Sequence, residues 1–394
     1  MTERQAAEPL RINTMGCRWE VDISRLEAPL AQRLRELWAA CSDWRPDRSE
    51  PDGFPEVLTA YHAGTSDRPD GSVIALQPDV ESAPYAFSGA ITLRCIERQA
   101  GRMTLLHSAA LALPDSGATV ILIAESGTGK TTAARRLGER LGYLSDETAV
   151  IRGDLTLIAH PKPLSIIPEP GRPKIEVAPE EIGLLPAPDQ PWLAAAVLLS
   201  RSPDVAAPVL EPVDVFEALA EVIPQSSSLP LQEQPLDTLA GVLTAGAGCF
   251  RLRYSEIDAA ADLVVDVLRS VSRGEQRSRT WQVVTPPQDQ RTGPWVASPA
   301  EEGELPPGGR VVRAPWRDAL ADEDGDVFAL NGPRPVRLMA LGASIWRGCA
   351  EPRTVEEIRD QIVAEHGPHP DADSLVRQAI ATLADEGLVR FVPA

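Results

Sequence analysis

The 394-residue chain lacks several features that would assign it to a familiar class of protein. It has five cysteines, an odd number, and none is in CxxC spacing, so the sequence supports neither a disulfide framework nor a zinc site. The longest apolar stretches, such as Trp192 to Leu199, fall far short of the ~18 residues that cross a bilayer. The chain also begins without the apolar segment of a secretory signal. We therefore expect a cytoplasmic protein that does not contact a membrane.

Positive charge is scarce as well. The chain has 38 Lys and Arg against 57 Asp and Glu, which gives a formal net charge of -19. Such a balance disfavours a large surface for a nucleic-acid backbone. Hydrophobic residues make up 43% of the chain, which is enough for an ordinary core and excludes disorder of the whole chain. Because single cores stop growing at about 250 to 300 residues, we expect more than one domain.

Proline and glycine mark the expected domain boundaries. Their densest joint cluster lies in residues 273–309, and a segment of that composition is typical of a linker. Before it we expect an α+β lead-in at 1–101, packed on a core domain at 102–272. After it we expect a small domain at 310–394.

Hydrophobic periodicity predicts the first elements. The stripe of Leu30, Leu34, Leu37 and Trp38 predicts a helix within Ile23 to Cys41, and Ser88 to Gln99 predicts a second. Two apolar runs, 103–113 and 118–124, are joined by Pro-Asp-Ser-Gly, which is typical of a tight turn. These runs predict a β-hairpin.

The second strand of this hairpin leads into a glycine-rich loop. Residues 124–131 have the sequence AESGTGKT, which is Walker A spacing with alanine for the first glycine, and a helical pattern follows. The glycines let backbone N–H groups point at phosphate oxygens, and the helix N-terminus adds its positive end. Lys130 would reach the β and γ phosphates and Thr131 would bind Mg²⁺. We expect ATP and Mg²⁺ as cofactors, with the nucleotide bound by Ser126, Gly127, Thr128, Gly129, Lys130, Thr131 and Thr132.

Two adjacent carboxylates, Asp146 and Glu147, follow one helix later. A right-handed crossover would lay their strand, 143–151, beside the strand that precedes the loop. One carboxylate could then hold Mg²⁺ while the other accepts a proton from an attacking hydroxyl. The alternative is a solvated strand end without a role in chemistry.

These segments together resemble HPr serine kinase/phosphorylase and its relatives. The resemblance rests on Leu106-His107-Ser108-Ala109-Ala110, on Glu125 to Thr131 and on Leu144-Ser145-Asp146-Glu147, and it extends more weakly to Arg273. It implies an α/β P-loop kinase fold and ATP-dependent phosphorylation of a hydroxyl on a protein or peptide. It also implies roles for single residues: Asp146 as general base, Glu147 as the second acid and a metal ligand with Thr131, Lys130 at the nucleotide, and His107 as an active-site histidine.

The sequence departs from that family at several points. Ala124 replaces the first glycine of the loop, Thr132 stands where the family has an acidic residue, and Glu147 replaces an aspartate. No match to the family's glycine-rich phosphorylase signature is found, so we expect the kinase direction alone. Taken by itself, His107 is more typical of a core histidine.

A proline-rich stretch downstream, 161–174, contains Lys162, Arg172 and Lys174. A cation there could neutralise the transferring phosphoryl group. Solvated surface charge is the commoner explanation for such residues.

The last 85 residues predict a hairpin followed by three helices, a winged-helix-like unit. We expect strands 311–316 and 326–330 to pair around the acidic turn 322–325. The expected helices contain Leu341 to Cys349, run from the capping box Thr354–Glu357 through Ala364, and run from Ser374 to Glu386 with Asp373 as cap and Gly387 as stop.

A DNA-binding role does not fit this unit, because it has 10 basic and 14 acidic residues, a net charge of 10 − 14 = −4. Its segments 341–346, 352–358 and 385–389 instead resemble the PqqD-like family. That resemblance implies recognition of the leader of a ribosomally made, post-translationally modified peptide. The leader would add a strand at the hairpin edge near Val311 to Arg317.

The two resemblances predict a kinase that phosphorylates a Ser or Thr hydroxyl of a precursor peptide, of which lasso-peptide precursors are one type. A tethered leader would raise the effective substrate concentration to about the millimolar range. Two alternatives stay open: a nucleotide-binding scaffold or chaperone without transfer, and a small-molecule kinase of the shikimate-kinase kind. The ~120 residues before the loop argue against the last, because in those enzymes the loop strand usually comes first. A homo-oligomer is compatible with the sequence, and a nucleic-acid partner is not expected.

Overall fold

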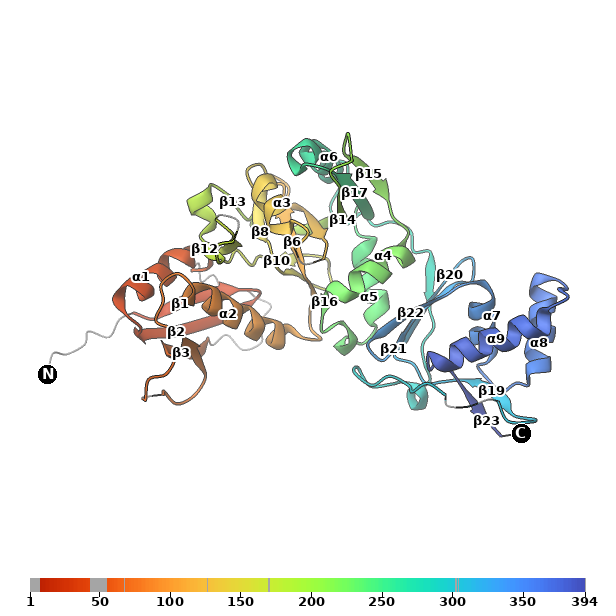
Figure 1. The fold of residues 1–394 in the computed structure, drawn as a ribbon. Helices are drawn as coiled ribbons and strands as arrows, with labels where there is room; N and C mark the ends of the chain where they lie inside the picture. Colours follow the sequence, from red (N-terminus) through yellow and green to blue (C-terminus); the bar gives the residue numbers. More distant parts are fainter. Residues whose placement is uncertain are drawn as a thin grey trace. The chain divides into compact units, whose positions relative to one another are not determined.

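The computed structural model describes residues 8–42, 55–66, 68–125, 127–168, 171–301, 303 and 305–393. The fold is mixed α/β, as expected (Figure 1). The chain divides into two compact units. Unit 1 comprises Met1–Asp214, Gln225–Ser227 and Val242–Arg277, and unit 2 comprises Val215–Pro224, Ser228–Gly241 and Ser278–Ala394. No helix in the described ranges is long and apolar enough to cross a membrane.

Unit 1 begins with a four-stranded sheet in the order β1-β2-β3-β4. Its strands are β1 (Leu10–Thr14), β2 (Cys17–Arg25), β3 (Glu56–His62) and β4 (Val73–Leu76), and its helices are α1 (Ala28–Leu37) and α2 (Ala83–Gln99). The predicted helices are confirmed with shifted starts. The first begins at Ala28 because alternating burial continues β2 as far as Arg25, and a proline then opens the helix.

A seven-stranded sheet in the order β13-β8-β6-β7-β14-β17-β15 forms the centre of unit 1. Its strands are β6 (Ser108–Ala112), β7 (Ala118–Ile123), β8 (Gly142–Ser145), β13 (Leu185–Pro186), β14 (Trp192–Arg201), β15 (Val209–Pro212) and β17 (Cys249–Tyr254). The predicted hairpin is confirmed, because β6 and β7 pair antiparallel. Helices α3 (Lys130–Leu137) and α6 (Ile257–Arg269) share one apolar core with this sheet.

The predicted crossover is wrong in one respect. Strand β8 pairs with β6 and not with β7. The hairpin partner β6 fills the position beside β7, and β14 fills the other side. Because β6 is antiparallel to both neighbours, β7 and β8 run parallel to each other, and β6 starts at the edge where they end. The loop after β7, the residues after β8 and the residue before β6 therefore meet at one edge of the sheet.

That residue before β6 is His107, which divides the apolar run expected as one strand. The part before it is β5 (Thr104–Leu106), which belongs to another sheet in the order β10-β9-β5-β16. Its other strands are β9 (Ala149–Ile151), β10 (Leu157–Ile158) and β16 (Ser226–Ser227). A two-stranded ribbon of β11 (Leu164–Ile166) and β12 (Ile175–Val177) completes the surroundings of the site.

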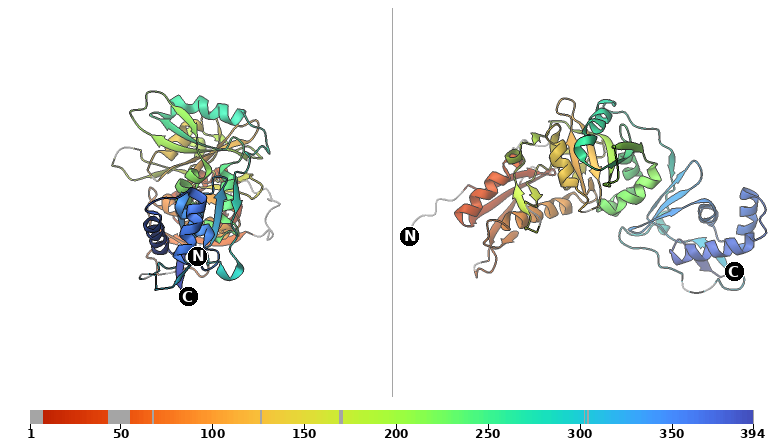
Figure 2. Two further views of the ribbon diagram at one scale, coloured as in Figure 1. Left: turned by 90° about the vertical axis from the view of Figure 1, so that its right-hand side faces the viewer. Right: turned by 45° about the horizontal axis from the view of Figure 1, so that its top comes forward.

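Unit 2 has a four-stranded sheet in the order β18-β20-β21-β22 with helices on both faces. The strands are β18 (Trp281–Val283), β20 (Asp318–Asp322), β21 (Val327–Asn331) and β22 (Arg334–Leu338). Helices α7 (Ala340–Gly348), α8 (Val355–His366) and α9 (Ala372–Asp385), drawn in blue, share a core with alternate residues of β21, and further views are given in Figure 2. The intervening Phe328 contacts Phe216 of α4 (Val215–Val222) with ring centroids 5.9 Å apart.

The three predicted C-terminal helices and the capping box of Thr354 with Glu357 are confirmed. The predicted strand pairing is wrong. The acidic turn is tight, with Asp322 N–H donating to Asp326 O at 3.0 Å, so the strand directly before it, β20, is the partner of β21. Strand β19 (Arg310–Arg313) instead pairs with β23 (Val389–Val392). Asp373 is not the cap of α9, since Asp371 holds that position and Asp373 accepts from Arg377.

Two further expectations change in unit 2. The edge expected to receive a leader, around Val311, is already occupied, because Val311 and Arg353 exchange backbone hydrogen bonds of 2.7 and 2.9 Å. The segment expected as a linker contains β18, which pairs with β20, and the Trp281 ring is buried with its Nε1 donating to Asp237 at 2.8 Å. This part of the segment is therefore sheet, while residues 302 and 304 lie outside the described residues. The remaining domain boundaries stay predictions.

Candidate functional site

A cavity of about 380 Å³ opens at the sheet edge where β7 and β8 end. It brings together most of the predicted site residues: His107, Gly127, Gly129, Lys130, Thr131, Thr132, Asp146 and Glu147. Thr128 does not line the cavity, and its hydroxyl donates to Glu125 O at 2.6 Å. Ser126 lies outside the described residues.

The glycine-rich loop has the backbone that its sequence predicts. Gly127 and Gly129 have φ of 84° and 100°, in the left-handed region that favours glycine. A Cβ built at either position meets no atom within 4 Å, so the loop surface is open. Helix α3 begins directly afterwards at Lys130. An open loop of this kind at a helix N-terminus suits an anionic group.

The ammonium group of Lys130 is turned back onto this loop. Its Nζ donates to the carbonyl oxygens of Ala124 and Glu125, and the residue is 6% exposed. Burial lowers the pKa of Lys130, and the charge of Asp146 acts in the opposite direction. Phosphate oxygens could replace the two carbonyl contacts without a new backbone conformation.

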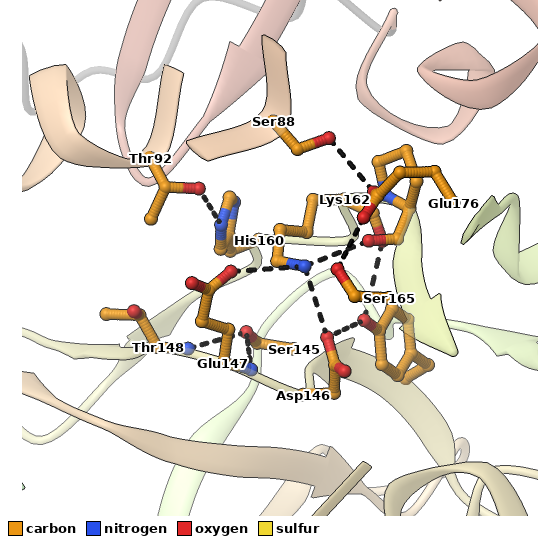
Figure 3. Close-up of polar contacts among 12 residues, drawn as sticks. Ser88, Thr92, Ser145, Asp146, Glu147, Thr148, His160, Lys162, Ser165 and Glu176 are labelled. Atoms are coloured by element: carbon orange, nitrogen blue, oxygen red, sulfur yellow. Dashed lines mark hydrogen bonds and ion pairs between the residues drawn. The ribbon is translucent and has the colours of Figure 1, made fainter. Parts of the chain in front are cut away.

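The acidic pair lies on a tight turn at the end of β8 (Figure 3). The N–H groups of Glu147 and Thr148 donate to Ser145 Oγ at 3.1 and 3.0 Å. Asp146 is 5% exposed and accepts a hydrogen bond of 2.9 Å from the Tyr143 hydroxyl at Oδ1. The Glu147 side chain is 39% exposed. The buried acid and the exposed acid therefore have different surroundings.

Sequence reasoning missed the importance of Lys162. Its side chain is 2% exposed, and its Nζ lies 3.1 Å from Glu147 Oε2 and 3.6 Å from Asp146 Oδ1 (Figure 3). Burial by itself lowers the pKa of Lys162, but the carboxylates of Asp146, Glu147 and Glu176 outweigh it and hold this pKa above its usual range. The interpretation of Lys162 as surface charge is wrong.

A signal for this residue was present in the composition. The chain has three lysines among its 38 basic residues, and Lys130, Lys162 and Lys174 all line the cavity. Lys174 is exposed and lies 6.0 Å from the centre of the Tyr85 ring. Arg172, the other candidate cation of that stretch, does not line the cavity.

The lead-in contacts the surroundings of the site through a hydrogen bond from Ser88 of α2 to Glu176 of β12. This residue is 3% exposed and accepts hydrogen bonds from Ser88 of α2, at 3.0 Å, and from Ser165 of β11. Burial raises the pKa of Glu176, and Lys162 acts against this shift. The N-terminal elements are thus part of the surroundings of the acidic pair.

His107 is half-buried, and its backbone N–H donates to Gln225 O at 2.7 Å. Burial and the neighbouring charge of Lys130 lower the pKa of His107, which favours the neutral form of its ring. A neutral imidazole beside the loop can accept or donate a hydrogen bond without adding charge to the cavity.

The donor set suits Mg²⁺ best in company with a phosphate. Among the described residues, no group of three or more His, Cys, Asp or Glu could hold a metal ion alone. Thr131 and Glu147 line the same cavity and offer oxygen atoms. Mg²⁺ commonly takes one or two carboxylates together with substrate phosphates, and this arrangement suits that mode.

Comparisons with known proteins give a family match for the C-terminal part of the chain and similarities to solved structures. Residues 320–389 match the family model described as coenzyme PQQ synthesis protein D (PqqD). The described chain is also similar to the structure of the Hpr(Ser) kinase/phosphatase from Coxiella burnetii, at 12% identity over 42% of this chain and 94% of that one. The TM-score is 0.23, too low to support a mechanism. No curated protein matches.

Proposed function

We propose that this protein is an ATP-dependent kinase that phosphorylates a Ser or Thr hydroxyl of a ribosomally made precursor peptide. The observation that carries this proposal is the meeting of the glycine-rich loop and Asp146 in one cavity. The loop suits the phosphates of ATP, and a buried carboxylate a short distance along the same sheet edge suits a general base.

The chemistry follows from these positions. The loop N–H groups and Lys130 bind the phosphates, and Mg²⁺, held through Thr131 and Glu147, would neutralise charge on them. The oxygen of the acceptor hydroxyl bonds to the γ-phosphorus, the bond to the β,γ-bridging oxygen breaks, and the hydroxyl proton passes to Asp146. ADP leaves and a phosphate ester is formed. His107, which also lines the cavity, can orient the acceptor by a hydrogen bond.

Unit 2 is proposed to bind the leader of the precursor. The PqqD match and the net charge of its last 85 residues support a peptide over DNA. Because the edge near Val311 is occupied, the better candidate for strand addition is β22, the terminal strand of its sheet in the described residues. Pro335 within β22 is typical of an edge strand.

The direct test incubates the full chain with Mg²⁺, γ-labelled ATP and precursor peptides encoded near its gene, and locates the label by mass spectrometry. We expect one phosphate on a Ser or Thr of the peptide, and little on the same peptide without its leader. ATP binding without transfer to any peptide would favour the scaffold alternative. Transfer to a small hydroxylated metabolite, independent of peptide, would favour the small-molecule kinase.

A further inference from the structure

The ammonium group of Lys162 lies among three oxygen atoms. An ammonium group has three donors. The Nζ of Lys162 donates to Pro163 O at 2.9 Å and lies 3.1 Å from Glu147 Oε2 and 3.6 Å from Asp146 Oδ1. Only 2% of its side chain is exposed, so the ammonium group is enclosed together with these three oxygens. This geometry indicates that Lys162 acts by positioning the carboxylates of Asp146 and Glu147.

Each carboxylate is held through one oxygen only. Asp146 Oδ1 accepts from the Tyr143 hydroxyl at 2.9 Å and faces Lys162, and Glu147 Oε2 faces Lys162. Among the described residues, no hydrogen bond reaches Asp146 Oδ2 or Glu147 Oε1. Two adjacent carboxylates repel each other, and a cation beside one oxygen of each offsets that repulsion. It also restricts the orientation of both carboxylate groups.

We propose that Lys162 is the positioning residue that separates the roles of the acidic pair: by holding Asp146 Oδ1 and Glu147 Oε2, it leaves Oδ2 to accept the proton of the acceptor hydroxyl and Oε1 to bind Mg²⁺. The assignment of the two free oxygens rests on the proposed kinase function. Lys162 itself does not contact the reacting atoms.

The test compares Lys162→Met with wild type in two assays. In the first, kcat for a precursor peptide should fall at least about 100-fold, as for loss of an oriented base, while KM for ATP stays within about threefold. In the second, binding of Mn²⁺ alone to the nucleotide-free enzyme should tighten severalfold, because both carboxylates lose their internal counter-charge. Arg140→Met, which removes an exposed partner of Asp262, should change neither value.

A second variant covers the case in which Lys162→Met does not fold. Tyr143→Phe removes the other contact to Asp146 Oδ1 without a change in charge, and should lower kcat about tenfold with KM for ATP unchanged. A rise in KM for ATP with kcat retained in Lys162→Met would make Lys162 a nucleotide ligand and overturn the proposal. So would wild-type kcat and Mn²⁺ affinity in a folded variant that is merely less stable.

Failure of the kinase proposal would be visible separately. If wild type labels no peptide, the proposed function fails, and Mn²⁺ binding then decides about Lys162 independently of any substrate. Unchanged Mn²⁺ affinity in Lys162→Met would then show that this lysine does not control the charge of the acidic pair.

Discussion

Replacement of Asp146 by Asn tests the proposed base with the least change in shape. The amide oxygen of Asn can still accept a hydrogen bond from the Tyr143 hydroxyl, in place of the 2.9 Å bond to Asp146 Oδ1. What disappears is the negative charge and with it the capacity to accept a proton. The variant therefore separates chemistry from packing.

The cost in stability should be moderate. Breaking a buried ion pair by removing one partner commonly costs about 3 to 5 kcal/mol. Here Lys162 keeps Glu147 Oε2 at 3.1 Å, a shorter contact than the 3.6 Å to Asp146. We expect a loss nearer to that of one charged hydrogen bond, about 1 to 3 kcal/mol. The variant should therefore fold at assay temperature.

The cost in turnover should be larger. Loss of a general base lowers the rate by about 100- to 10,000-fold, which is about 3 to 5 kcal/mol in activation free energy. ATP affinity should stay the same or rise slightly, because the variant lacks the negative charge of Asp146, which lies near Lys130 and would repel the phosphates of ATP.

The assay is single-turnover transfer of label to a precursor peptide, with ATP affinity by calorimetry and thermal unfolding by circular dichroism on the same samples. Glu147→Gln is the matched control: it should raise the Mg²⁺ concentration needed for half-maximal rate more than it lowers the maximal rate. Transfer by Asp146→Asn at the wild-type rate would refute the reasoning and leave Glu147 and His107 as candidates for the base.

Three further predictions concern the loop, the leader and pH. Lys130→Ala should weaken ATP binding by about 2 to 5 kcal/mol, and equal affinity by calorimetry would contradict a phosphate contact. Removal of the leader from a precursor should raise the KM for that precursor about 100-fold with KM for ATP unchanged, and free leader should compete with the full precursor. Binding of duplex DNA by the full chain instead would count against unit 2 as a peptide site. Burial lowers the pKa of His160 to about 3, below about 6.5 in the unfolded chain. The stability it contributes is therefore present above about pH 6.5 and lost toward pH 3, on the order of 5 kcal/mol in all. In urea unfolding, the free energy of unfolding of His160→Gln should therefore fall less steeply than that of wild type as the pH drops from 6.5 to 3, and an equal fall would contradict this.

The full chain is the proper material for the leader experiment because unit 2 is not continuous in sequence. Its sheet includes β18, Phe328 of β21 contacts Phe216 of α4, and Asp318 Oδ2 accepts a hydrogen bond of 2.9 Å from the Leu236 N–H. Truncation at Gly309 would remove the partners of these groups and confuse loss of binding with loss of folding.

Features that depend on neighbouring residues could be predicted from the sequence. The glycine-rich loop, the hairpin turn and the capping box of Thr354 are set by side chains within a few positions of each other, and all were predicted. The two family resemblances, in the loop with its acidic pair and in the C-terminal unit, also come from local runs of residues, and the second has a counterpart in the PqqD family model.

Tertiary structure decided which distant segments became neighbours. No local pattern states that β6 lies between β7 and β8, because lateral strand order depends on which partner fills each side of a strand. Likewise nothing near Lys162 in the sequence indicates burial, since its surroundings come from the turn after β8 and from Glu176 of β12, the latter held by α2. A charged side chain is stable inside a protein only when such partners converge on it from several elements, and that convergence exists only in the folded chain.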